Sequence, residues 1–320
     1  MAELVKGDVP IKALKRSKSS TLNTEKFFNY KYGAEGKTLF SKIQWVDGDI
    51  MDIYSLEEAM EGVKEVYHCA TFVSLRDENP DEIIITAEKG TENMVNAALN
   101  KGIEKYCHVS SIAALGMPIN GTEITEECFE EFSFTNSPYA IGKHLAEAEV
   151  WRAGAEGLNI VVVLPSIVVG SWPDKDNGSM GFFSFVKKNS KFYTGGTMGF
   201  VDVKDVVGTM QQLMKENHFN ERYIVSSENL SFHDFYTWIA QSIGKPIPTT
   251  KLNNFTLKLF QLLYNIGAKN KISSTMIEHA TGVHIYSNKK VSEALKGYNF
   301  TPIKETIEQT GKFFLNEVGK

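Results

Sequence analysis

The feature that most constrains the fold is an alternation of short β-branched runs with longer helical patterns over the first two thirds of the chain. Strands are expected at 9–14, 43–46, 63–69, 105–109 and 159–164, and helices at 55–62, 81–100 and 138–156. Segment 159–164 (NIVVVL) is apolar on both faces, as a central strand of a parallel sheet is. The pattern predicts βαβ units and an α/β fold. Ser55, with Glu58 three residues on, is the expected cap of the first of these helices.

Composition excludes several classes of protein. The chain has 320 residues, 42% of them hydrophobic, and 34 Lys+Arg against 39 Asp+Glu. It is therefore too apolar for a disordered chain, and it lacks the basic character of a nucleic-acid-binding protein. The three cysteines, Cys69, Cys107 and Cys128, have no close spacing, so we expect neither a disulfide framework nor a metal site.

The sequence also indicates a compartment. The N-terminus has no apolar stretch of signal-peptide length. The longest apolar run, 160–170, is broken by Pro165 and Ser166 and falls short of the ~18 residues that a membrane-spanning helix needs. We expect a cytoplasmic protein without a membrane span.

A change in residue composition after Pro165 predicts that the chain folds into a core and a smaller lobe. Glycine, asparagine and aromatic residues crowd 170–200, and mostly helical patterns follow Leu230. We expect a core at 1–170, to which 200–227 returns, and a smaller, mostly helical lobe formed by 171–199 and 228–320.

The sharpest chemical motif is Tyr139-Ala140-Ile141-Gly142-Lys143, at the start of an expected helix. A spacing of four places Tyr139 and Lys143 on one helical face. The tyrosine hydroxyl has an ordinary pKa of ~10, and a neighbouring ammonium is expected to lower it by favouring the phenolate. Such a pair can pass a proton to or from an oxygen while hydride moves at carbon. In isolation, however, this spacing is more often an ordinary solvated helix face.

Ser110 and Ser111 strengthen that interpretation. They end the expected strand 105–109, where open parallel sheets bind ligands. A hydroxyl there could orient a substrate oxygen toward Tyr139, although serines at strand ends also serve as ordinary turn residues.

Taken together, these segments resemble the extended short-chain dehydrogenase/reductase family, in the NAD-dependent epimerase/dehydratase and dihydroflavonol-reductase-like branch. The resemblance spans essentially the whole chain. It rests on Asp47-Gly48-Asp49-Ile50, His68-Cys69-Ala70-Thr71, Gly90-Thr91, Val109-Ser110-Ser111, Tyr139 to Lys143, Pro165 to Gly170, Phe200 to Val206, and Tyr286 to Lys290 with Leu295. It implies a Rossmann-like parallel sheet with helices on both faces.

The resemblance also implies site residues. Tyr139 would be the acid/base, Lys143 would hold the nicotinamide ribose, and Ser111 would orient the substrate. The other residues implied along the cofactor are Asp49, Ile50, Ala70, Thr71, Pro165 and Ser166.

Two departures from the family pattern stand out. The family opens with a strand and a Gly-x-x-Gly-x-x-Gly turn that receives the pyrophosphate, whereas the early glycines here are Gly7, Gly33, Gly36 and Gly48. We therefore expect the first strand of the family's sheet to be missing, which leaves a gap between the strands at 9–14 and 63–69. The smaller departure is Ala87, where the family has asparagine.

The basic cluster Lys15-Arg16-Ser17-Lys18 follows the expected strand 9–14. An arginine at this place accommodates a 2′-phosphate, so Arg16 favours NADP over NAD, which stays possible. The alternative is a solvated loop charge.

The leading hypothesis is an NADP(H)-dependent oxidoreductase that interconverts a carbonyl and an alcohol on a small organic substrate. A nucleotide-sugar epimerase or dehydratase is the first alternative. Such enzymes usually place arginine and asparagine where this chain has Leu164-Pro165-Ser166, and the acidic loop 123–131 is an unfavourable neighbour for a diphosphate. A non-catalytic binding protein is the second alternative, because the glycine turn is absent. A homodimer is compatible with the sequence, which leaves the oligomeric state open.

Overall fold

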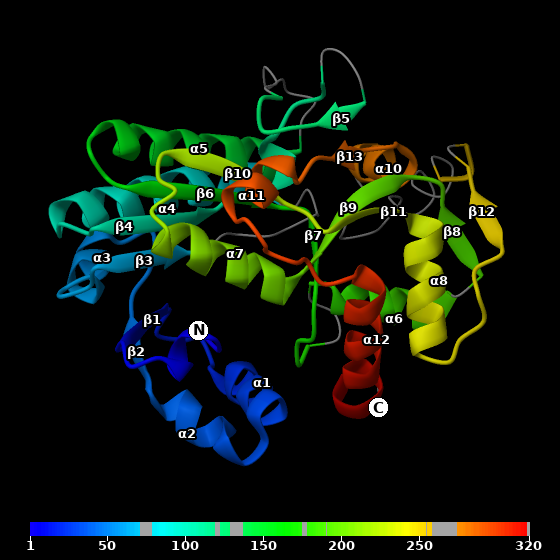
Figure 1. The fold of residues 1–320 in the computed structure, drawn as a ribbon, viewed down its shortest axis with the longest axis horizontal. Helices are drawn as coiled ribbons and strands as arrows, with labels where there is room; N and C mark the ends of the chain where they lie inside the picture. Colours follow the sequence, from blue (N-terminus) through cyan, green and yellow to red (C-terminus); the bar gives the residue numbers. More distant parts are fainter. Residues whose placement is uncertain are drawn as a thin grey trace.

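The core of the molecule is a four-stranded parallel sheet (Figure 1). The computed structural model describes residues 1–70, 79–118, 122–128, 137–174, 178–189, 191–253, 255–257 and 274–318. The strands of this sheet, in spatial order, are β10 (Glu221–Val225), β6 (Ile160–Pro165), β4 (Lys105–Val109) and β3 (Glu65–His68). Every residue of β6 is buried, as predicted from a sequence that is apolar on both faces of the strand.

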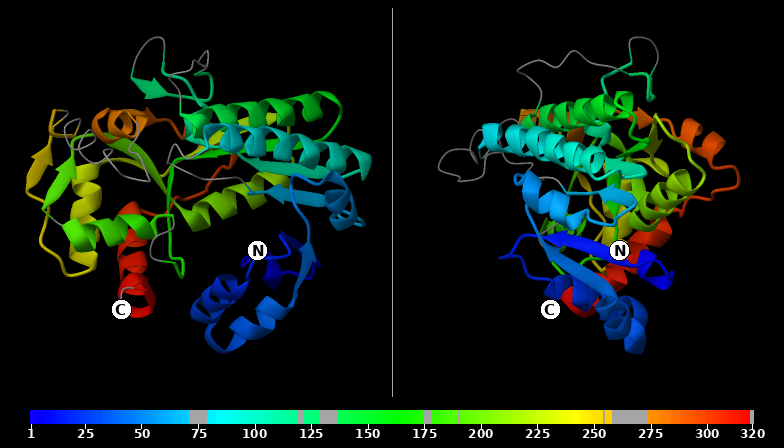
Figure 2. Two further views of the ribbon diagram at one scale, coloured as in Figure 1. Left: turned by 180° about the vertical axis from the view of Figure 1, so that it is seen from behind. Right: turned by 90° about the vertical axis from the view of Figure 1, so that its left-hand side faces the viewer.

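Helices cover both faces of this sheet (Figure 2). One face carries α4 (Pro80–Asn100) and α5 (Pro138–Ala155), with α3 (Ile53–Ala59) beside α4; the other carries α7 (Val203–Lys215) and α11 (Lys289–Ala294). Successive strand residues point to opposite faces. Accordingly Val162 packs with Val150 of α5, whereas Val161 packs in the cluster that contains Met210 of α7.

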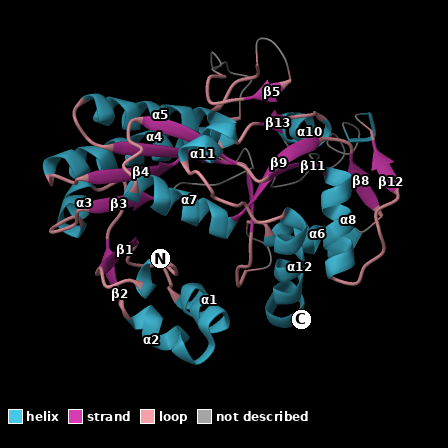
Figure 3. Cartoon of the chain, in the orientation of Figure 1, coloured by secondary structure: helices cyan, strands magenta, loops and turns pink. Residues whose placement is uncertain are grey.

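A second group of elements forms the C-terminal lobe. Its strands are β7 (Ile167–Val169), β9 (Thr197–Asp202) and β11 (Glu228–Ser231) in one sheet, β8 (Phe192–Thr194) with β12 (Thr250–Leu252), and β13 (Ile285–Tyr286) with β5 (Glu123–Ile124). Its helices are α6 (Met180–Asn189), α8 (Phe232–Ser242), α10 (Ser274–Thr281) and α12 (Ile303–Phe313), followed by the π-helical turn η4 (Phe314–Val318). The lobe therefore mixes short strands with its helices (Figure 3). The division at 170, 200 and 227 stays a prediction.

Two aspartates attach this lobe to the core, and they explain part of the motif at 200–206. Asp202 caps α7 by accepting from the Lys204 amide at 2.7 Å, and it also accepts from the Thr306 hydroxyl at 2.7 Å. Asp205 accepts from the Thr301 amide at 2.7 Å. Burial raises the pKa of Asp205, whereas its hydrogen bonds with Thr301 and Tyr298 act in the opposite direction.

The N-terminal residues form a unit of their own. They contain η1 (Leu4–Lys6), β1 (Ile11–Lys15), α1 (Leu22–Tyr32), η2 (Gly33–Glu35), α2 (Gly36–Ser41) and β2 (Ile43–Asp47). Strands β1 and β2 pair in parallel, and Val5, Phe28 and Ile43 form a small buried core. Among the described residues no strand pairs with the other edge of β1 or with the outer edge of β3. This separation agrees with the gap predicted between these two strands.

Aromatic contacts join the N-terminal unit to the C-terminal lobe. The rings of Tyr30 on α1 and Phe313 on α12 meet edge to face, with centroids 4.4 Å apart. The ring centroids of Phe27 and Trp172 lie 6.0 Å apart. Lys12 of β1 also donates to the Glu61 carbonyl oxygen at 2.6 Å, so the unit is joined to the core as well as to the lobe.

The predicted elements of the core agree with the structure to within a few residues, with one correction. Helix α3 begins two residues before the expected cap, because Asp52 accepts from the Tyr54 amide at 3.1 Å. Ser55 thus lies inside the helix, where its hydroxyl donates to the Asp52 carbonyl oxygen at 2.8 Å. The predicted capping box is wrong, since Asp52 was the better acceptor at the helix start.

Two further findings concern the described residues alone. No helix among them is both long and apolar enough to cross a membrane. In the same part of the chain, no three His, Cys, Asp or Glu side chains gather as they would around a metal ion.

Helices α4 and α5 approach each other closely at Gly142. Gly142 faces α4, and a Cβ atom added there would lie 3.0 Å from the Ala87 Cβ and 3.4 Å from the Ile83 carbonyl oxygen. A larger side chain would push the two helices apart.

We expect Gly142→Val to reduce the free energy of unfolding by about 1–3 kcal/mol, because it overpacks this contact. Helix propensity alone predicts the opposite sign. Urea denaturation of the variant and of Ala155→Val, at an exposed position on the same helix, provides the comparison. A Gly142→Val protein as stable as the parent would contradict this account of the α4–α5 contact.

Candidate functional site

Helix α5 begins directly beside the carboxyl end of β4. Ser137 caps it by accepting from the Ala140 amide at 3.2 Å, and Pro138 occupies its first position, where the missing N–H is not needed. These two residues fix the helix start, so Tyr139 lies in the first turn. Tyr139 and Lys143 follow on one face, as predicted.

The structure brings Tyr139 and Ser111 together. The Ser111 hydroxyl accepts from the Ala113 amide at 3.1 Å, which caps the short helix η3 (Ile112–Ala114). The same side chain lies beside the Tyr139 hydroxyl, where its hydrogen bonding favours the phenolate. Ser111 thus has both roles considered from the sequence, a turn residue and a neighbour of the tyrosine.

The pKa of Tyr139 is raised, because burial disfavours the phenolate more than the hydrogen bond from Ser111 favours it. The expectation of a lowered pKa is therefore wrong in this structure. The reason lies in the balance of burial against charge, which the motif spacing does not contain. At neutral pH the hydroxyl stays protonated and is able to donate.

Lys143 is almost fully buried, 3% exposed, and its ammonium donates to the Val109 carbonyl oxygen at 2.8 Å. Burial lowers its pKa to about 8, while Cys69 and Glu147 act in the opposite direction. Near neutral pH the side chain is still mainly an ammonium, and one bond to Val109 leaves it two further donors.

A buried ion pair beside this site was not predicted. Arg222 of β10 donates to Glu147 of α5 over 3.0 Å, and both side chains are at most 10% exposed. Glu147 also accepts from the Ser110 hydroxyl at 2.7 Å. The only sequence signal was the position of Glu147, one turn after Lys143 on the same helical face; its partner lies 75 residues away.

Part of the acidic loop is also buried. The Glu126 carboxylate accepts from the Ile224 amide at 2.8 Å, and its backbone carbonyl oxygen accepts from Arg222. Burial raises the pKa of Glu126. This carboxylate is therefore held at the edge of β10 by its hydrogen bond from Ile224.

The predicted adenosine end of the cofactor site forms a pocket of about 270 Å³. It is lined by Arg16, Ser17, Asp47, Gly48, Asp49, Asp52 and Ser55. Its carboxylates have local partners: Asp47 pairs with Lys15, Asp49 accepts from the Met51 amide at 3.0 Å, and Asp52 caps α3. Arg16 is exposed at the pocket, so the structure brings Arg16 and Asp49 together.

The remaining predicted cofactor residues are scattered. Ile50 packs against Gly90 of α4, and Ala70 is exposed just after β3. Thr71 lies outside the described residues. Pro165 and Ser166 are both buried at the end of β6, and the Ser166 amide donates to the Val225 carbonyl oxygen at 3.1 Å.

A dinucleotide fits the two ends of this site better than its middle. The Arg16 pocket offers a cation and hydroxyls for a phosphorylated ribose, and Lys143, Tyr139 and Ser111 offer donors at the other end. No triple of glycines with the spacing of the pyrophosphate turn follows a strand in the described chain before β3.

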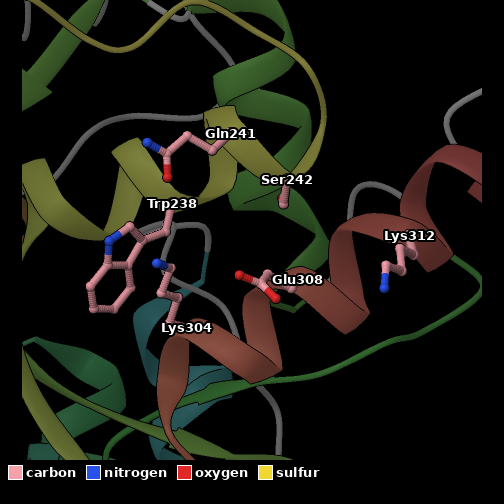
Figure 4. Close-up of a pocket in the computed structure, with 6 residues that line it drawn as sticks. All are labelled: Trp238, Gln241, Ser242, Lys304, Glu308 and Lys312. Atoms are coloured by element: carbon pink, nitrogen blue, oxygen red, sulfur yellow. The ribbon is translucent and has the colours of Figure 1, made fainter.

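A second cavity, of about 250 Å³, lies between α8 and α12 (Figure 4). It is lined by Trp238, Gln241, Ser242, Lys304, Glu308 and Lys312. None of the residues predicted for catalysis or cofactor binding lines it.

Known proteins share this sequence pattern. The chain is 27% identical over 274 residues to cinnamoyl-CoA reductase 1 of Petunia hybrida, across 82% of this chain and 74% of that protein. It is 28% identical over 202 residues to sterol demethylase protein B of Methylococcus capsulatus, across 63% of this chain. That match spans 61% of the relative's length.

The fold is also known. A nucleoside-diphosphate-sugar epimerase from Pseudomonas aeruginosa superimposes with a TM-score of 0.76 at 16% identity, over 98% of this chain and 92% of that one. At this identity the likeness concerns the Rossmann-type fold alone.

A family model decides the assignment. The model described as the NAD dependent epimerase/dehydratase family matches residues 8–225, more than half of the chain. The match includes β4, the start of α5, Tyr139, Lys143 and the Arg16 pocket. The chain belongs to the NAD-dependent epimerase/dehydratase family, within the extended short-chain dehydrogenases/reductases.

Proposed function

We propose that this protein is an NADP(H)-dependent oxidoreductase that interconverts a carbonyl and an alcohol on a small organic substrate. The observation that carries the proposal is the meeting of Tyr139, Ser111 and Lys143 at the carboxyl end of β4. This is the edge of a parallel sheet at which α/β proteins bind their ligands. The similarity to cinnamoyl-CoA reductase supports the same reaction class.

Each side chain has a task in the reduction. The nicotinamide, when bound, supplies the hydride. The Ser111 and Tyr139 hydroxyls hydrogen-bond the carbonyl oxygen, and Tyr139 gives it a proton as negative charge develops there. The raised pKa of Tyr139 keeps that proton available at neutral pH. Lys143 holds the ribose hydroxyls, with its position fixed by Val109.

The direct test measures NADPH oxidation with aldehydes, ketones and flavanonols, and in parallel the interconversion of UDP- and dTDP-sugars. We expect turnover of carbonyl compounds. Turnover of the sugars alone would instead establish the epimerase or dehydratase function. The burial of Arg222 against Glu147 disfavours that alternative, because this guanidinium is not available to a diphosphate.

The third hypothesis, a binding protein without catalysis, is tested by fluorescence titration with NADPH. Binding without turnover of any carbonyl or sugar would favour it. If the protein does not bind NADPH or NADH, the oxidoreductase proposal is wrong.

We expect Tyr139→Phe to lower kcat by about 10²–10⁴-fold, because it removes the proton donor. The Kd for NADPH should change little, since the ring remains. Tyr54→Phe, at an 80% exposed position on α3, is the matched control and should keep full activity. Full activity of Tyr139→Phe would exclude the tyrosine as the acid.

The pH profile follows from Lys143. Its pKa of about 8 means that the ammonium is present below pH 8 and is lost as the pH rises through that value. We therefore expect kcat/KM for NADPH to fall about tenfold per pH unit above pH 8, because kcat/KM reports groups of the free enzyme. A profile that stays flat to pH 9.5 would show that the charge of Lys143 is not needed.

Arg16 is the proposed determinant of NADP over NAD. We expect Arg16→Gln to raise the Kd for NADPH about tenfold, a loss of about 1.4 kcal/mol, while the Kd for NADH changes less than about twofold. Lys18→Gln, in the same loop but outside the pocket, is the control. Equal weakening of both cofactors would contradict a specific contact with the 2′-phosphate.

A further inference from the structure

Helix α5 meets the end of β4 at three points, one helical turn apart. Each point joins one side chain of the helix to one of three consecutive residues of the strand end. The pairs are Tyr139 with Ser111, Lys143 with Val109, and Glu147 with Ser110. The first two pairs contain the proposed catalytic groups, and the third has no role in the family pattern considered so far.

The Glu147 carboxylate is held on several sides. It accepts from the Ser110 hydroxyl at 2.7 Å, from the Trp151 indole at 3.1 Å and from the Arg222 guanidinium at 3.0 Å. Its side chain is 4% exposed. A buried carboxylate with this many donors has a fixed orientation, and the Arg222 guanidinium is its ionic partner.

The position of Glu147 matters for its two neighbours. Ser110 directly precedes Ser111, so fixing the Ser110 hydroxyl fixes the backbone from which Ser111 reaches Tyr139. The charge of Glu147 also acts on Lys143, one turn away. In the part of the chain that the structure describes, Cys69 and His68 on the β3 side and His108 on β4 also interact with Lys143.

Both histidines are neutral at physiological pH. Burial lowers the pKa of His68 to about 3, and it lowers the pKa of His108 well below its ordinary value. They therefore add no positive charge beside the buried Lys143. Among the described residues, Glu147 is the carboxylate that acts on this ammonium.

We propose that Glu147 is a positioning residue for the reaction: its carboxylate fixes the Ser110-Ser111 strand end against α5 and keeps a negative charge beside Lys143, with Arg222 as its counter-ion. The proposal rests on the proposed function for its catalytic consequence. Its structural and electrostatic content can be measured independently of turnover.

The charge is tested in Glu147→Gln, where the amide oxygen can still accept a hydrogen bond. The probe is the pH titration of the lysine Cε resonance in protein labelled with ¹³C-lysine, with Lys143 assigned by its loss in Lys143→Arg. We expect the midpoint of Lys143 to fall by about one pH unit, because removal of the nearby charge disfavours the ammonium. Glu149→Gln, which breaks a surface pair with Arg152 on the same helix, should leave it unchanged.

Glu147→Gln removes the negative charge that Arg222 pairs with at 3.0 Å, and loss of one member of a buried pair can prevent folding. The double variant Glu147→Gln/Arg222→Met removes both charges together and avoids this cost. We expect the same downward shift of the Lys143 midpoint in the double variant. Glu147→Asp keeps the negative charge, so we expect its Lys143 midpoint to lie close to that of the parent protein. A midpoint unchanged within about 0.3 units in the double variant would overturn the electrostatic part.

The geometric part is tested in Ser110→Ala, which keeps the charge of Glu147. We expect kcat for a carbonyl substrate to fall about tenfold with KM nearly unchanged, because Ser111 loses its fixed position in the transition state. The Lys143 midpoint should not move. Unchanged kcat would overturn the positioning role of the Ser110 contact.

These results separate the two proposals. If the parent protein turns over no carbonyl compound, the proposed function fails, while the Lys143 titration still decides whether Glu147 acts on this ammonium. If turnover is present and neither Glu147→Gln nor Ser110→Ala changes the titration or kcat, the positioning role fails alone.

Discussion

The buried ion pair of Glu147 and Arg222 is the interaction on which the arrangement of the site depends. It connects the helix that carries the proposed acid to β10 at the far edge of the core sheet. Through Ser110 it reaches the end of β4, and through the Glu126 carbonyl oxygen it reaches the loop that follows. Buried pairs of this kind contribute little net stability compared with apolar packing, but removal of one partner is costly. The pair therefore defines geometry more than it adds stability.

Much of the fold could be predicted from the sequence, because local hydrophobic patterns and helix-start residues determine the helices and strands. The bounds of β4 were predicted exactly at 105–109, and α5 was predicted within one residue, since Pro138 marks its start. The family pattern also predicted which residues approach one another at the strand end. Tyr139, Ser111 and Lys143 all lie at this strand end, and their roles stay a prediction.

The remaining features depend on contacts distant in sequence. The partner of Glu147 is 75 residues away, so no spacing rule indicates it. The pKa of Tyr139 is raised by burial, whereas the motif suggested that it would be lowered. The acidic loop 123–131 was predicted to be an unfavourable neighbour for a diphosphate, and no pattern indicated that Glu126 in it bonds the edge of β10. In each case tertiary packing, which a single sequence does not contain, decides the outcome.

The separate N-terminal unit has a consequence for cooperativity. Its core of Val5, Ala13, Phe28 and Ile43 is formed by residues close in sequence, and its strands share no ladder with the core sheet in the described chain. Units with few contacts to the rest of a protein open at lower free energy than the global transition. The amides of β1 and β2 thus belong to a different foldon from those of β4 and β6. The Arg16 pocket lies where the first meets the start of α3, and the tyrosine site is built on the second.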